Sequence, residues 1–315
     1  MKYDIISVGS AVVDAFVESK FKEKKGEMLI PIGRKILVEH LGFATGGGGT
    51  NTSAAFARFG LTRDCLGRLG RDDNGKMILG ELKEIGVDFL GKSCDEPTGY
   101  SVILDSRMKD RTILTYRGAN ELLTSGDIEW DELDSAWFYF STMLEKSLDS
   151  PIKLANWARK KGIKLAYNAD GFVIENERAK VLEILQKTDV LIVNDDEANR
   201  LCRGEWSFKK LFRFGPRIAC VTKGEEGSEA CDGFFVFSSK PNKVEVVERT
   251  GAGDAFASGF VAGLIELDNV EQAVKIGQLN AESVIQKKGA KNGLLEWKDA
   301  LRRIGSVKVR KSGFR

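Results

Sequence analysis

The alternation of short apolar runs with longer amphipathic segments constrains the fold of this chain more than any other feature. Runs such as "YDIISVG" (3–9), "DVLIVND" (189–195) and "RIACVTKG" (217–224) have the length and composition of buried strands. Between such runs lie stretches with helical spacing, for example "AFASGFVAGLIEL" (255–267). This rhythm predicts an α/β fold with three layers: a doubly wound, mostly parallel sheet with helices on both faces.

Two regions in the N-terminal half break this rhythm. Residues of about 15–44 and 97–117 alternate apolar and polar side chains with a period of two and contain no helical stretch. We expect them to be inserted into the main fold and to form a small antiparallel sheet that acts as a lid. The 315 residues would then make one domain with two lid insertions.

The charge balance and the apolar pattern argue against several classes of protein. Lys and Arg total 48 against 46 Asp and Glu, a net charge of +2 that disfavours a general polyanion-binding role. The basic tail 308–315 is most simply solvated surface; nucleic-acid binding is the alternative, testable by deletion after Val307. No run approaches the roughly eighteen apolar residues of a membrane span, so we expect a cytoplasmic protein without membrane or nucleic-acid partners.

Cysteine and histidine usage indicates neither a metal site nor a nucleophilic triad. The five cysteines are scattered and never form a C-x-x-C pair, so neither a disulfide framework nor a zinc ribbon is indicated. A Ser-His-Asp or Cys-His mechanism would have to use the single histidine, His40, which lies in a segment typical of strand and turn.

The segment "GVDFLGKS" (86–93) matches the P-loop pattern G-x-x-x-x-G-K-[ST]. A P-loop follows a strand and leads into a helix whose free N–H groups face phosphate. Here the preceding residues have helical spacing, which predicts that Gly86 ends a helix. Strand-like alternation follows Lys92 instead of a helix. We therefore interpret the match as coincidental.

A second glycine-rich segment has the context that the first one lacks. In "VEVVERTGAGDAFASGF" (244–260), a β-branched run leads into Gly251, Ala252 and Gly253, and a helical pattern begins at Asp254. Small residues at a helix N-terminus let backbone N–H groups approach an oxyanion closely. Asp254 either caps the helix or accepts a proton from a hydroxyl that attacks a phosphoryl group, and the spacing alone leaves both roles open.

The motif "RTGAGDAFASGF" (249–260) resembles the C-terminal signature of the ribokinase-like (PfkB-type) carbohydrate kinases. Further elements similar to this family appear in order along essentially the whole chain: "GSAVVDAF" (9–16), "GGGGTNTSAAFARFG" (46–60), "GRLGRDDNG" (67–75), "GVDF" (86–89), "NDDEANRL" (194–201) and "VTKGEEGS" (221–228). The resemblance implies an ATP-dependent kinase that transfers the γ-phosphoryl group to a hydroxyl of a small sugar or sugar-like molecule. It also accounts for the glycine at position 86.

The resemblance implies a role for each matching residue. Asp254 would be the general base, and the amides of Gly251, Ala252 and Gly253 would stabilise charge on the transferred group. The residues expected to hold substrate hydroxyls are Asp14, Gly47, Gly48 and Asn51. Those expected near the nucleotide are Asn194, Thr222, Gly224, Gly227 and, close to the adenine, Asn280. Glu197 would organise Mg²⁺, largely through water.

Some positions depart from the family pattern. Many members carry aspartate six residues before the catalytic one, in a loop linked to a monovalent cation; here that residue is Glu248, which leaves K⁺ activation uncertain. Asn168 and Asp170 occur in the opposite order to the usual D-x-N, so neither receives a role. Arg111 is either a lid residue that reaches the site or an ordinary edge-strand charge.

The acceptor and the assembly leave alternatives open. Nucleosides, sugar phosphates and inositol are possible acceptors within the same chemistry, and Arg111 and Arg117 are available for a phosphate. A non-catalytic sugar- or nucleotide-binding regulator is the alternative of another class. Exposed edges and one apolar face of the small sheet favour pairing with another copy, so we expect a homodimer through the lid.

Overall fold

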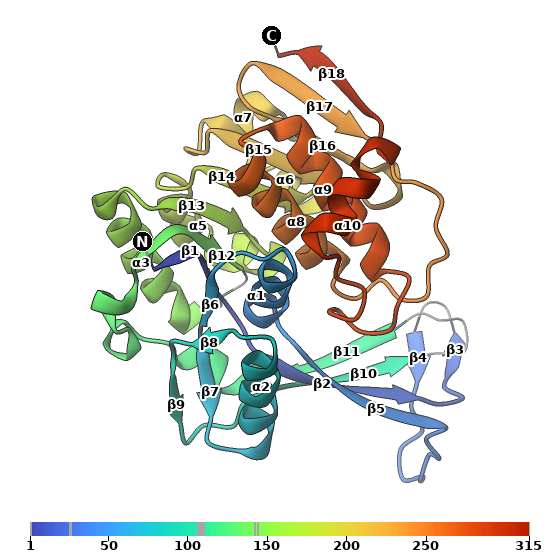
Figure 1. Cartoon of the computed structure of the whole chain (residues 1–315). Coiled ribbons are helices and arrows are strands. Elements are labelled where there is room, and N and C mark those ends of the chain that lie inside the picture. The colour runs from blue at the N-terminus through green and yellow to red at the C-terminus, as the bar shows by residue number, and fades with distance from the viewer. Residues whose placement is uncertain (1, 25–26, 106–110, 142, 144, 315) are drawn as a thin grey trace.

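A large sheet forms the centre of the molecule. The computed structural model describes residues 2–24, 27–105, 111–141, 143 and 145–314 (Figure 1). Within that part of the chain the main sheet has ten strands. Their spatial order is β18 (Val309–Gly313), β17 (Phe235–Ser239), β16 (Ser228–Cys231), β15 (Ile218–Thr222), β14 (Val190–Asn194), β13 (Lys164–Asn168), β12 (Ser135–Phe140), β1 (Tyr3–Val8), β6 (Arg63–Leu66) and β8 (Asp88–Phe89).

The pairing directions confirm a mostly parallel sheet. All neighbours from β15 to β8 pair in parallel, and only β16, β17 and β18 add antiparallel pairs at one edge. The chain starts in the middle at β1, continues to β6 on one side and later returns to β12 on the other. Neighbouring β1 and β12 therefore form a topological switch point, where sheets of this kind bind ligands beyond the carboxyl ends of their strands.

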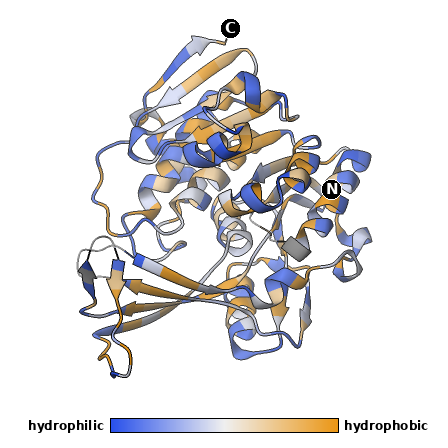
Figure 2. Ribbon diagram, turned by 180° about the vertical axis from the view of Figure 1, so that it is seen from behind, coloured by the Kyte–Doolittle hydropathy of each residue, from blue (hydrophilic) through white to orange (hydrophobic). Residues whose placement is uncertain are grey.

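Helices cover both faces of this sheet, as the alternation of apolar segments predicts. Residues from both sides of each central strand are buried, for example Ile5 and Ile6 at 0% exposure. Figure 2 shows the hydrophobic residues concentrated in the strands and on the helix sides that face them. One face carries α3 (Asp149–Lys161), α4 (Gly171–Asn176), α5 (Arg178–Leu185), α6 (Asp195–Cys202) and α7 (Phe208–Phe212). The other carries α1 (Gly48–Arg58), α8 (Ala252–Leu267), α9 (Val270–Val284) and α10 (Trp297–Arg303).

The lid is a separate sheet of four strands that extends away from the body (Figure 1). Its order is β11 (Arg111–Tyr116), β10 (Gly99–Asp105), β2 (Val12–Glu18) and β5 (His40–Gly46). The outer pairings are antiparallel, but β2 and β10 pair in parallel, so the lid is mixed at its centre. Small elements complete the structure: β3 (Lys22–Lys24), β4 (Glu27–Leu29), β7 (Arg68–Gly70), β9 (Lys92–Cys94), α2 (Asp73–Glu84) and short 3₁₀ turns at Gly118–Leu122, Ser125–Asp127, Trp130–Glu132, Glu145–Leu148, Gly224–Glu226 and Ile304–Ser306.

The segment that matches the P-loop pattern does not have P-loop structure. Helix α2 ends just before it, and Gly86 has a left-handed φ of 69°, as is usual after a helix C-terminus. Lys92 lies on the short strand β9, and its ammonium pairs with Glu129 at 2.8 Å. The next described element is the strand β10, so Lys92 is not followed by the helix that a P-loop requires.

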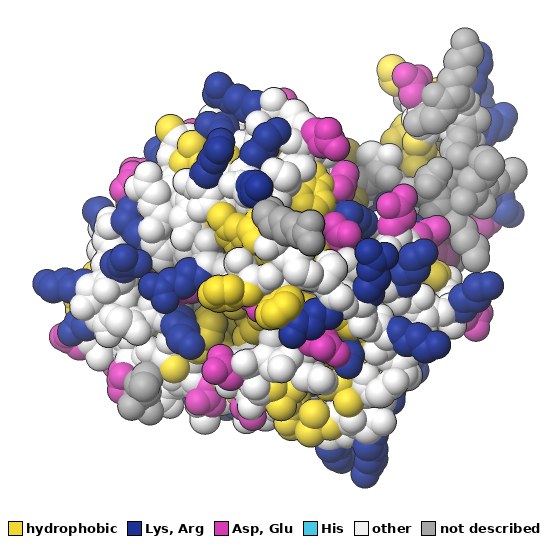
Figure 3. All heavy atoms as spheres, turned by 90° about the horizontal axis from the view of Figure 1, so that it is seen from above, with side chains coloured by type: hydrophobic (Ala, Val, Ile, Leu, Met, Phe, Trp, Pro, Cys, Tyr) yellow, Lys and Arg dark blue, Asp and Glu magenta, His cyan; other side chains and the backbone are white. Residues whose placement is uncertain are grey.

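The basic C-terminal tail is part of the main sheet. Residues Val309–Gly313 form the edge strand β18, and Lys311 lies 3.8 Å from the ring centroid of Phe235 on the neighbouring strand. Figure 3 shows the molecule from above, and on this face basic side chains are mixed with acidic and apolar ones. Deletion after Val307 would thus remove a strand, so loss of binding on deletion would not identify a nucleic-acid contact. No helix in the described part of the chain is long and apolar enough to cross a membrane.

Candidate active site

The candidate site lies where several parallel strands end. Gly9 follows β1 and Ser141 follows β12 at the switch point, while Asn194 and Thr222 are the last residues of β14 and β15. Helix α1, which starts after the lid strand β5, and helix α8 bring further residues to this edge and contact each other. The topology therefore collects residues from distant parts of the chain at one end of the sheet.

The N-terminus of α8 offers unpaired N–H groups. Gly251 precedes the helix with a left-handed φ of 77°, and a Cβ built on it would lie 2.5 Å from the Cβ of Ala290. The N–H of Ala252 donates to the carbonyl of Arg249 at 3.3 Å, but the N–H groups of Gly253 and Asp254 have no acceptor among the described residues. A Cβ on Gly253 would meet nothing within 4 Å, so the approach is open. This helix end can bind an anion.

The carboxylate of Asp254 does not cap its helix. Gly251 is the N-cap residue, and no side chain caps α8. Oδ2 of Asp254 instead accepts a hydrogen bond of 2.9 Å from Nδ2 of Asn51 on α1. Burial raises the pKa of Asp254, and the hydrogen bond from Asn51 partly offsets this effect. A carboxylate with a raised pKa beside free N–H groups has the features of a general base at an anion site.

The glycine run from the end of β5 into the first turn of α1 lets two backbones pack closely. Gly47 has a left-handed φ of 95°, and a Cβ on it would lie 2.5 Å from the carbonyl oxygen of Ser10. A Cβ on Gly49 would lie 2.8 Å from the carbonyl of Gly9. A Cβ on Gly48 would lie 2.4 Å from Oγ of Ser141 and 3.6 Å from Oδ1 of Asp254. The run thus brings the start of α1 against the end of β1, next to the carboxylate.

Several buried polar atoms near Asp254 lack hydrogen-bond partners among the described residues. They are Oδ1 of Asn51, Oγ of Ser141 and the hydroxyl of Tyr139. Buried polar groups are normally paired, so unpaired ones around a carboxylate indicate a site for a polar ligand. We did not predict Ser141 from the sequence. The sequence feature that could have identified Ser141 as a site residue is its position as the first polar residue after a buried strand.

The lid contributes Asp14 to the same region. Asp14 lies on β2 opposite Ser101 of β10, and a Cβ on Gly46 would lie 2.2 Å from its carboxylate. Burial raises the pKa of Asp14, while a hydrogen bond from Ser101 and the charge of Lys291 lower it. Lys291, which the sequence did not identify either, is 9% exposed and bonds to Oγ1 of Thr45 at 2.6 Å and to Oε2 of Glu81 at 2.9 Å.

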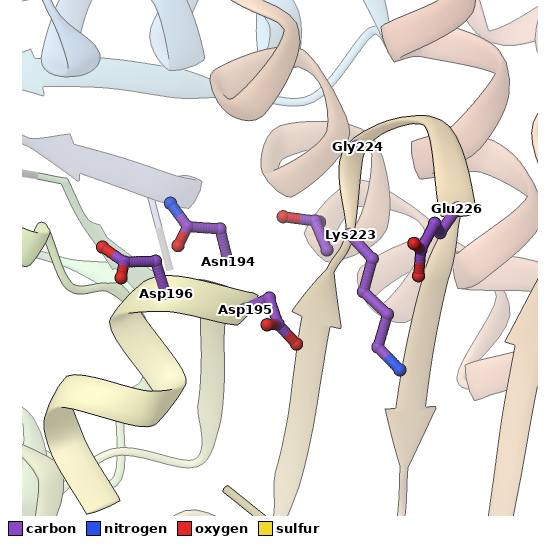
Figure 4. Close-up of a pocket in the computed structure, with 7 residues that line it drawn as sticks. Asn194, Asp195, Asp196, Lys223, Gly224 and Glu226 are labelled. Atoms are coloured by element: carbon purple, nitrogen blue, oxygen red, sulfur yellow. The ribbon is translucent and has the colours of Figure 1, made fainter. Parts of the chain in front are cut away.

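A cavity of about 320 Å³ lies between the start of α6 and the loop after β15 (Figure 4). It is lined by Asn194, Asp195, Asp196, Thr222, Lys223, Gly224 and Glu226. Figure 4 shows Asn194 and Asp196 on one side and the loop with Gly224 on the other. Three of the residues expected near a nucleotide therefore share one cavity.

Asn194 and Glu197 form a reciprocal cap at the start of α6. Oδ1 of Asn194 accepts from the N–H of Glu197 at 2.9 Å, and Oε2 of Glu197 accepts from the N–H of Asn194 at 2.7 Å. The pKa of Glu197 is raised to about 7, mainly by burial; the nearby charges of Asp170 and Asp196 contribute to the increase, and hydrogen bonds from the backbone oppose it. This cap holds Asn194 at the cavity. Asp170 and Asp196 make the surroundings of Glu197 acidic.

The remaining residues have other surroundings. Asn280 is fully buried: its Nδ2 donates to the carbonyl of Ala255, and its Oδ1 accepts from the N–H of Leu295. Its amide joins α9 to α8, so it leaves no free polar group for a ligand, and its expected position close to the adenine stays a prediction. Gly227 closes the turn between β15 and β16, where a Cβ would lie 2.0 Å from the carbonyl oxygen of Ser239. It supports the loop and does not line the cavity.

Asn168 and Asp170 are used within the protein. Nδ2 of Asn168 donates to the carbonyl of Ile192 at 2.9 Å, and the carboxylate of Asp170 caps α4. Arg111 donates to Oγ1 of Thr250 and lies near Glu248, so it reaches from the lid to the segment before α8.

A free helix N-terminus beside the half-buried carboxylate of Asp254, with a separate polar cavity at neighbouring strand ends, defines an α/β protein equipped for phosphoryl transfer. Residues 4–298 match the family described as pfkB family carbohydrate kinase, and the chain belongs to this family. The resemblance noted in the sequence is confirmed. The protein is a phosphotransferase with an alcohol group as acceptor, an ATP-dependent kinase of sugars or nucleosides.

Similar proteins span nearly the whole chain. The ribokinase of Haemophilus influenzae is 26% identical over 316 residues, covering 93% of this chain and 96% of that protein. Fructokinase-2 of Oryza sativa is 27% identical over 310 residues, covering 89% and 92%. The crystal structure of adenosine kinase from Sinorhizobium meliloti has a TM-score of 0.81 at 26% identity, covering 96% and 99%. The structure of Arabidopsis thaliana ribokinase complexed with ribose and ATP also has a TM-score of 0.81, at 24% identity.

Proposed function

We propose that this kinase transfers the γ-phosphoryl group of ATP to a hydroxyl of a small, uncharged sugar or sugar-like acceptor, with Asp254 as general base. The observation that carries the proposal is the position of the Asp254 carboxylate beside the unpaired N–H groups of Gly253 and Asp254. Phosphoryl transfer has a loose transition state, so positioning and charge stabilisation supply most of the acceleration. These N–H groups would stabilise the transferred group while Asp254 accepts the hydroxyl proton.

The acceptor would lie between the lid and the start of α1. Asp14 can accept hydrogen bonds from two hydroxyls, and the unpaired atoms of Asn51 and Ser141 can bond to others. Gly48 would let the acceptor approach Asp254 closely. This arrangement suits a molecule rich in hydroxyl groups.

An uncharged acceptor is favoured because the nearby cations already have partners. Arg111 bonds to Thr250 and lies 3.7 Å from Glu248. Arg117 lies 3.7 Å from Glu121 and over the ring of Phe172. Lys291 pairs with Glu81. A sugar phosphate would have to break one of these pairs, so it is the less favoured acceptor.

The nucleotide phosphates would lie between α8 and the cavity formed by Asn194, Thr222 and Gly224. A divalent metal ion is implied by ATP-dependent transfer. The described residues contain no cluster of three or more metal-binding side chains, so direct coordination by the protein is not indicated. Asp170 and Asp196 lie near enough to Glu197 for their charges to raise its pKa, and this acidic group would suit a hydrated Mg²⁺, which stabilises charge on the phosphates when bound.

Glu248 does not present a free carboxylate for K⁺. Its Oε2 accepts from the N–H of Gly289 at 2.9 Å, and its Oε1 faces Arg111. We therefore expect turnover without K⁺. An assay in K⁺, Na⁺ and tetramethylammonium chloride should give equal rates, and strong activation by K⁺ alone would contradict this expectation.

The lid also supports the proposal of a homodimer. Leu41, Phe43, Leu114 and Tyr116 are each about half exposed, and their register places them on one face of the lid. A second copy could cover this apolar face. Sedimentation at micromolar concentration should show a dimer that F43E or L114E converts to monomer; a monomeric wild type would remove the proposal. A cytoplasmic location stays a prediction.

An ADP-release screen tests the function. The candidate acceptors are pentoses, hexoses, their phosphates, nucleosides and inositol, each with ATP and Mg²⁺. We expect turnover with an uncharged acceptor. Exclusive use of a sugar phosphate would overturn the acceptor class, and a nucleotide complex with its triphosphate beside Lys92 would overturn the site.

A further inference from the structure

The lid carries a row of ionisable side chains at its outer end. Glu18, His40, Asp105 and Arg111 are directly opposite one another across the four strands. Directly paired residues share a face, and Glu18 shares the face of Asp14 because the two are four residues apart on β2. The row therefore lies on the face of the lid that holds Asp14.

This row contacts the segments around the start of α8. Lys288 pairs with Glu18 at 2.7 Å, and Arg111 lies 3.7 Å from Oε1 of Glu248. Arg111 also donates to Oγ1 of Thr250, the residue before Gly251. These contacts join the face of the lid that holds Asp14 to the turn at which the anion-binding helix begins.

Arg111 and the backbone of Gly289 hold Glu248 from two sides. The N–H of Gly289 donates to Oε2 of Glu248 at 2.9 Å, and Ala290 packs against Gly251. The side chains of Arg111 and Glu248 are 33% and 18% exposed, against 68% and 37% for Lys288 and Glu18. The Arg111–Glu248 pair is therefore screened less by water and salt, although at 3.7 Å it is longer than the 2.7 Å pair of Lys288 with Glu18.

We propose that Arg111 is a positioning residue: by bonding to Thr250 and pairing with Glu248, it aligns the free N–H groups of α8 with the acceptor held by the lid. The inference rests on the proposed function. Arg111 touches neither reacting group in this arrangement. It acts through the turn from Glu248 to Gly251, on which the direction of the N–H groups of Gly253 and Asp254 depends.

The test compares R111A, T250V and the double variant at saturating ATP and acceptor. A small misplacement of reacting groups can cost about 100-fold in rate, so we expect each single variant to lower kcat about 10- to 100-fold. The double variant should be no slower than the slower single one, because both remove the same contact. The acceptor KM and the affinity for ADP should change little, and T250S should restore most of the rate.

K288A provides the matched control, since it removes the neighbouring lid contact and leaves Arg111 in place. It should keep the wild-type kcat. An unchanged kcat in R111A or T250V, or losses that multiply in the double variant, would overturn the proposal. D254N run in parallel separates the two claims: if D254N is inactive while R111A keeps full kcat, the proposed function stands and this inference fails. Thermal unfolding of each variant identifies any loss of fold, and R111K then provides a milder change with the same expected direction.

Discussion

Replacement of Asp254 by Asn tests the proposed chemistry most directly. Oδ2 of Asp254 accepts from Nδ2 of Asn51 at 2.9 Å, which leaves Oδ1, on the side of Gly48, for the acceptor hydroxyl. D254N keeps the size of the side chain but removes its ability to accept a proton. Oδ1 of Asn51 has no partner among the described residues, so a turned amide of Asn51 can accept from the new amide. The fold should therefore tolerate the change.

The expected loss is in turnover and not in nucleotide binding. General-base catalysis usually contributes about 10²- to 10⁴-fold, which corresponds to about 2.7 to 5.4 kcal/mol in the barrier. The N–H groups of α8 remain, so the dissociation constant for ATP should change little. Because burial raises the pKa of Asp254, ionising this carboxyl group makes the folded wild-type protein less stable as the pH rises above the ordinary range of a carboxyl pKa. At pH 8 the melting temperature of D254N should equal or exceed that of the wild type.

The assay is coupled ADP release with the best acceptor from the screen, at saturating concentrations of both substrates. D268N is the matched control: Asp268 ends the same helix with a left-handed φ of 46°, a conformation that Asn tolerates. D268N should turn over like the wild type. If D254N turns over within about threefold of D268N, the general-base role is refuted.

Other predictions concern the metal site, the helix start and the coincidental motif. Glu197 has a folded pKa of about 7 against 4.5 for the free group, so its ionisation lowers stability as pH rises through this range. Without metal, E197Q should raise the free energy of unfolding by up to about 3 kcal/mol at pH 8 and by much less near pH 5. The kinase rate of E197Q should also depend less on the Mg²⁺ concentration. If the difference in melting temperature between E197Q and the wild type is the same at pH 5 and pH 8, the prediction is wrong. G251A should destabilise the protein by about 1 to 3 kcal/mol in urea unfolding, because Gly251 has a positive φ and contacts Ala290, whereas G253A should unfold like the wild type. K92A should leave ATP turnover unchanged, and a raised KM for ATP would revive the P-loop interpretation.

Local sequence patterns predicted the structure correctly where it depends on interactions between residues that are close in the sequence. The end of α2 at Glu84 followed from helical spacing and Gly86, and the change at Gly251–Asp254 from a β-branched run to small residues located the start of α8 near its true position. The role of Asn280 could not be obtained in this way. The sequence pattern around an asparagine on a helix does not show whether its side chain contacts a ligand or bonds, as here, to the backbone of a neighbouring helix.

The sequence by itself determined the class of fold, the family and the helix that can bind an anion, because apolar periodicity and glycine positions act over a few residues at a time. Only the tertiary structure decided which groups meet: that Asn51 bonds to Asp254 across 203 positions of sequence, that Ser141 lies unpaired beside Gly48, and that Arg111 reaches Thr250. Contacts of this kind depend on how strands and helices are arranged in space, and their distances are not encoded in any local pattern.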